Sequence, residues 1–146
     1  MKRFTMLLAA VGVLAAAALP ATAGATPKRA QAQILGTVVR TADGGADVTA
    51  RYTCPEGFHL WVSAKQSADG SRDPRLTEEG SSQYSAAWLQ NHPTQFTCDG
   101  DWHTGTYRVD LSEYGFGALQ KGQAWVQFCL IGETTFLSES RWVAVR

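Results

Sequence analysis

Few side chains in this sequence could take part in covalent chemistry. The three histidines, His59, His92 and His103, are not spaced as zinc ligands on one element, so ordinary surface histidines are expected. The G-x-S-x-G and H-E-x-x-H motifs are absent from the sequence. Glu78 and Glu79 are adjacent, so they cannot face each other across a sugar as the two carboxylates of a glycosidase must. We therefore predict no catalytic centre, no metal site and no cofactor.

Tryptophan is the most informative residue type. Five occur in the 146 residues, at positions 61, 88, 102, 125 and 142. Trp61 and Trp125 alternate with apolar residues, which predicts that they point away from the core. Outward tryptophans could form a platform for a glycan or a protein partner, because the ring offers a large contact area at little entropic cost. Alternatively, Ser67–Gln90 or the end of the chain could cover these rings as a second core.

The N-terminus has the pattern of a secretory signal peptide. Lys2 and Arg3 precede the apolar run Phe4–Leu19, and small residues follow, with cleavage expected after Ala23 or Ala25. The run of 16 residues is shorter than a membrane span, so we predict a secreted protein with no span in the mature chain. Without the signal peptide, 11 basic residues remain against 13 acidic ones, which excludes a polybasic nucleic-acid binder.

Short alternating runs separated by turn residues predict an all-β protein. We expect strands over Ile34–Arg40, Asp47–Cys54, Phe58–Gln66, Thr94–Cys98, Trp102–Leu111, Gln123–Leu130 and Thr134–Arg146, with Ser81–Gln90 either strand or helical turn. The pattern fits an antiparallel two-sheet sandwich of the immunoglobulin-like kind, and a small closed barrel is the alternative. The predicted organisation is a signal peptide over residues 1–23, a flexible lead over 24–33 and one β-sandwich domain over 34–146.

An odd number of cysteines lies in the exported part, where disulfides persist. Alternation places Cys54 and Cys98 on inward faces and Cys129 on an outward face, which favours a Cys54–Cys98 bridge. Cys129 would then be a free thiol or would link two chains into a dimer. An immunoglobulin-style Cys54–Cys129 bridge stays open, because a bulge before Cys129 would turn this residue inward.

Four short segments carry a resemblance to a known group of proteins. They are Tyr52-Thr53-Cys54-Pro55, Val62–Gln66, Phe96-Thr97-Cys98-Asp99-Gly100 and Gly122–Val126. In this order they resemble the small secreted β-sandwich proteins common in actinobacteria such as Streptomyces. The resemblance implies that the Tyr-x-Cys-Pro and Cys-Asp-Gly motifs supply the two bridged cysteines, Cys54 and Cys98. It implies no particular activity.

Three functions fit these observations. We favour a non-enzymatic extracellular binding domain, whose partner would be a protein or a glycan. A carbohydrate-binding module would need Trp61 and Trp125 to be exposed and roughly coplanar. A secreted enzyme inhibitor would use an exposed loop, for which Ser67–Gly80 is the candidate.

Overall fold

The computed structural model describes residues 29–112 and 114–146, and this part of the chain is all-β, as predicted. Neither of its two short 3-10 helices has the length or the apolar character needed to cross a membrane. The predicted signal peptide, residues 1–23, lies outside the described residues, as do residues 24–28 of the predicted lead. The elements are β1 (Gln31–Arg40), β2 (Ala46–Thr53), β3 (His59–Gln66), η1 (Pro74–Thr77), η2 (Ser81–Tyr84), β4 (Ala87–Asn91), β5 (His103–Val109), β6 (Gly122–Ile131) and β7 (Phe136–Val145). Because β1 begins at Gln31, the strand includes three residues that were expected in the flexible lead.

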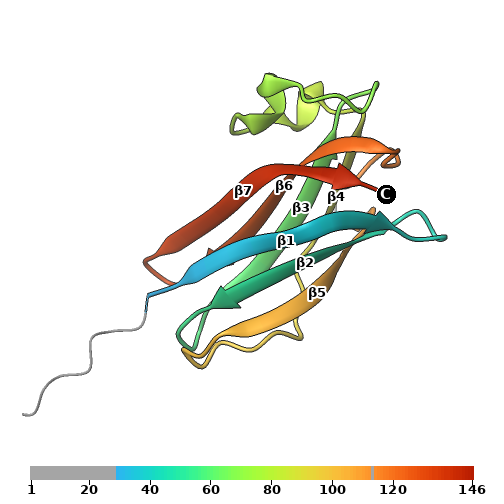
Figure 1. The fold of residues 1–146 in the computed structure, drawn as a ribbon. Helices are drawn as coiled ribbons and strands as arrows, with labels where there is room; N and C mark the ends of the chain where they lie inside the picture. Colours follow the sequence, from blue (N-terminus) through green and yellow to red (C-terminus); the bar gives the residue numbers. More distant parts are fainter. Residues whose placement is uncertain (1–28, 113) are drawn as a thin grey trace, which may run out of the picture.

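The seven strands form one continuous, curled sheet in the order β4-β3-β6-β7-β1-β2-β5 (Figure 1). All neighbouring pairs are antiparallel except β1 and β7, where Val38 pairs with Val145 in parallel. The sheet therefore differs from the purely antiparallel pair of sheets that the sequence predicts. The reason lies in β1, which pairs with β2 up to Leu35 and, after a shift of register, continues beside β7.

Gly36 lies in this register shift and has a φ of +62°, in the left-handed region that glycine favours. We expect Gly36→Ala to lower the free energy of unfolding by about 1 kcal/mol, because a Cβ is strained at this φ. A Cβ would meet no atom within 4 Å, so backbone strain is the only cost. Urea denaturation measures the effect, and Gly36→Asn should lose less, since asparagine tolerates this conformation. An alanine variant as stable as the wild type would contradict this role of Gly36.

The curl encloses one core between the two halves of the sheet. The largest fully buried apolar side chains come from both halves: Ile34, Val38, Val48, Tyr52, Leu60, Val62, Leu89, Val109, Phe128 and Leu130. The free edge of β4 approaches the segment after β5 through two isolated bridges, from Gln90 to Asp110 and from Trp88 to Phe116. The sheet thus comes close to meeting itself, which leaves only one broad outer surface on β4, β3, β6 and β7.

Cys54 and Cys98 form a disulfide at the end of β2, with 44 residues of sequence separation and 4.8 Å between their Cα atoms. The strand predicted over Thr94–Cys98 is wrong, because this segment is irregular. It finds no open sheet edge, since β2 already pairs with β1 on one side and β5 on the other. The segment is instead held by the disulfide and by the Thr97 amide, which donates to the Tyr52 hydroxyl at 3.3 Å.

Candidate functional site

The outer face of β4, β3, β6 and β7 carries aligned rows of aromatic and polar side chains. Strand register brings together residues that are far apart in the sequence, and alternation points them to the same side. In the order of these four strands, the rows are Trp88, Lys65, Trp125 and Trp142, then Gln90, Ser63, Gln127 and Ser140, and finally, from β3 onward, Trp61, Cys129 and Ser138. A middle row of amides and hydroxyls therefore separates two rows that contain tryptophan.

The segment between β3 and β4, residues 67–86, folds beside this face and makes it concave (Figure 1). Between the segment and the sheet lies a cavity of about 510 Å³, which we call the tryptophan cavity. Its volume is within the range of ligand pockets. The strands contribute Trp61, Lys65, Trp88, Trp125, Gln127, Cys129, Phe136, Ser138 and Ser140, and the 67–86 segment contributes residues 77–82.

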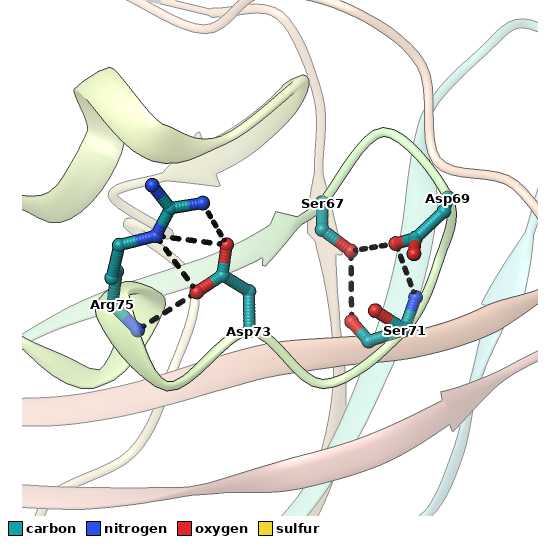
Figure 2. A network of polar contacts seen from close by, with 5 residues as sticks. All are labelled: Ser67, Asp69, Ser71, Asp73 and Arg75. Carbon is teal, nitrogen blue, oxygen red and sulfur yellow. Dashed lines mark hydrogen bonds and ion pairs between the residues drawn. The ribbon is translucent and has the colours of Figure 1, made fainter.

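Polar contacts fix the first part of the 67–86 segment (Figure 2). Asp69 accepts hydrogen bonds from the Ser71 amide at 3.0 Å and from the Ser67 hydroxyl at 2.8 Å. These bonds, with those from Ser71 foremost, lower the pKa of Asp69 to about 2, so its carboxylate stays ionised at neutral pH. Asp73 caps η1 through the Arg75 amide at 3.0 Å and pairs with the Arg75 guanidinium at 2.6 Å. The wall of the tryptophan cavity is therefore braced by local hydrogen bonds.

Lys65 spans the distance from the sheet to this wall. Its ammonium group donates to the Ser81 hydroxyl at 2.7 Å, and the Ser81 hydroxyl in turn donates to the Leu76 carbonyl at 2.9 Å. Lys65 is only 6% exposed, and burial lowers the pKa of its ammonium group. Within the described residues, no acidic side chain makes an ion pair with Lys65. The tryptophan cavity therefore contains a buried cation whose one polar partner is a neutral hydroxyl.

The tryptophan rings around the cavity are held in different ways. The Trp61 indole donates to the Gln90 side-chain oxygen at 3.0 Å, and Trp125 packs edge-on against Trp142 with 5.5 Å between ring centroids. The Trp88 ring packs against Phe116, but its Nε1 atom is buried with no hydrogen-bond partner among the described residues. A buried N–H without a partner is unfavourable, so the Trp88 indole is ready to donate to a ligand.

The structure places both predicted platform residues in the tryptophan cavity. Trp61 and Trp125 lie on the outer face, as alternation predicts, and each is half-buried. Their strand positions are about 14 Å apart, given four residues of strand rise and one strand spacing. They stand toward the two ends of the cavity floor with the Gln127 row between them. Part of this face is also covered by the 67–86 segment, which was the alternative expectation for these rings.

Cys129 is a free cysteine, and its outward direction agrees with the alternation of β6. Its exposure does not agree, because the side chain is fully buried in the floor of the cavity. The thiol donates to the Ser138 hydroxyl at 3.4 Å, and burial raises its pKa. A dimer linked through Cys129 would therefore require the side chains around it to move first.

Sequence reasoning missed Lys65, Trp88 and Gln127 as members of one site. The alternation of β3 does place Lys65 on the face of Trp61, and that of β6 places Gln127 beside Trp125. Trp88 lay in a segment whose structure was ambiguous. No local signal shows that the 67–86 segment folds over this face, so the enclosed cavity could not be predicted.

Comparisons with models of known protein families find no match for this chain, and neither do comparisons with curated protein sequences.

Proposed function

We propose that this protein is a secreted, non-enzymatic binding domain and that the tryptophan cavity binds a carbohydrate. In this proposal the signal peptide is removed after Ala23 or Ala25 and the curled sheet is a variant of the immunoglobulin-like sandwich. The disulfide is consistent with an extracellular protein, because such bonds persist in oxidising compartments. Export and cleavage would be seen in the intact mass of the protein recovered from the medium.

The observation that carries the proposal is the pattern of the cavity floor. Tryptophan rings stand at its ends, and amide and hydroxyl side chains such as Gln127 and Ser140 lie between them. A sugar ring presents C–H groups on its faces and hydroxyl groups around its edge. The tryptophans would contact the faces, while the amides and hydroxyls would bond to the edge.

Binding is favoured over catalysis by the placement of the carboxylates. The acidic residues at the cavity are Glu78 and Glu79, which are adjacent, exposed and on the same rim. Hydrolysis of a glycoside by the usual mechanism needs two carboxylates on opposite sides of the scissile bond. The inhibitor alternative gains no support, because the disulfide lies at the end of β2 and does not brace the loop of residues 67–80.

Affinity electrophoresis in gels containing xylan, galactan or polygalacturonate tests this function. We expect at least one of these polysaccharides to retard the wild-type protein. Trp125→Ala should weaken that binding at least tenfold, equivalent to about 1.4 kcal/mol, because a stacking surface is lost. Trp102→Ala is the matched control, since Trp102 is exposed, contacts Arg51 and does not line the cavity. No retardation by any polysaccharide, or equal losses in the two variants, would contradict the proposal.

A further inference from the structure

Lys65 gives the tryptophan cavity an electrostatic preference. A buried ammonium group normally has a carboxylate partner, because burying an unpaired charge is costly. Here Ser81 satisfies one of the three N–H donors, and no ion pair to Lys65 exists within the described part of the chain. The fold therefore retains an uncompensated positive charge at the cavity floor, in the place where a ligand would lie.

A second unsatisfied donor lies next to Lys65. Trp88 is the direct cross-strand neighbour of Lys65 on β4, and its buried Nε1–H has no partner among the described residues. Trp125 is the neighbour of Lys65 on the other side, on β6. One row of the sheet thus presents a cation, a free N–H donor and an aromatic face in adjacent positions, and all three residues line the cavity.

A ligand that satisfies this row must combine two chemical features. It needs an anionic oxygen that can accept from both the Lys65 ammonium and the Trp88 indole, as a carboxylate does with its two oxygens. It also needs a flat C–H surface to lie against Trp125. A sugar whose exocyclic carbon is oxidised to a carboxylate has both features in one ring.

We propose that the tryptophan cavity recognises a uronic acid unit of an acidic polysaccharide, with its carboxylate bound between Lys65 and Trp88. The inference rests on the proposed carbohydrate-binding function and adds the class of sugar. Glu78 and Glu79 do not oppose it strongly, because they are exposed at the rim, where water and salt screen their charges. Lys65 is shielded from the same screening by its burial.

Calorimetry with two matched probes tests this inference on the whole chain. The probes are a trimer of galacturonic acid and the same trimer with its carboxylates methyl-esterified, which removes the charge and keeps the ring. We expect the wild type to bind the acid at least tenfold more tightly than the ester. Lys65→Met should abolish this preference, while Lys121→Met should keep it, since Lys121 is exposed and outside the cavity.

The Lys65→Met variant should remain folded, because methionine replaces a buried, unpaired charge with an apolar chain of similar length. Its melting temperature, compared with that of the wild type, checks this point. The preference of the wild type for acid over ester tests the inference even without the variant.

Three outcomes would overturn the inference. Equal binding of acid and ester by the wild type would remove the uronic acid preference but leave carbohydrate binding intact. A preference that survives Lys65→Met would show that the carboxylate lies elsewhere. Binding of free benzoate as tight as that of the trimer would indicate a small aromatic acid as ligand. If neither trimer nor any polysaccharide binds, the proposed function fails as well.

Discussion

The Cys98→Ser variant is expected to lose about 4 kcal/mol of unfolding free energy, the largest stability effect of any substitution considered. The Cys54–Cys98 bridge closes a loop of 44 residues, and the chain-entropy model assigns about 4 kcal/mol to a loop of this length. The bridge also holds an irregular segment that has no strand partner. Guanidinium denaturation, read by tryptophan fluorescence, measures the change.

The Cys129→Ser variant serves as the control, because it removes a cysteine that is not in the bridge. Reducing the wild type under the same conditions should reproduce the loss seen in Cys98→Ser. A Cys98→Ser variant with the wild-type midpoint would show that the bridge does not stabilise the fold.

Cys129 is expected to react at least 100-fold more slowly with iodoacetamide in the native protein than in the urea-unfolded protein. Its side chain has no exposed surface, and burial raises the pKa of its thiol, so access and thiolate content are both reduced. Mass spectrometry of quenched samples follows the alkylation. The disulfide is left intact, so Cys129 is the one thiol that can be labelled.

The Phe136→Ala variant provides a comparison for this measurement. Phe136 is 65% exposed at the rim of the cavity, so its removal should change the labelling of Cys129 little if the floor is packed by other side chains. Rapid alkylation of the native wild type would contradict the burial of Cys129, and a dimer linked through this residue would again be reasonable.

Much of the sheet could be predicted from alternation alone. In β2, Val48, Ala50 and Tyr52 alternate with polar residues, and all three are buried. The period of two fixes which face each residue occupies once one face is apolar, so Cys54, Trp61 and Trp125 were assigned to the correct faces. The exception is Thr94–Cys98, whose strand-like composition could not form a strand without an open sheet edge.

The candidate site was only partly predictable, and Lys65 shows why. A lysine on an outward face is normally solvated, and nothing in its neighbours along the sequence indicates otherwise. Its burial comes from Ser81, 16 residues away, on a segment whose path is set by tertiary packing. The continuity of the sheet was missed for a similar reason, because the parallel pairing of Val38 with Val145 joins opposite ends of the domain.

The central claim is that the tryptophan cavity is a ligand site, and indole resonances test it most directly. In a ¹⁵N-labelled sample, each of the five tryptophans gives one side-chain N–H signal. On titration with the galacturonic acid trimer, we expect the signals of Trp88 and Trp125 to shift most and that of Trp102 to stay in place. A spectrum in which no indole signal moves, or in which Trp102 alone moves, would contradict the claim.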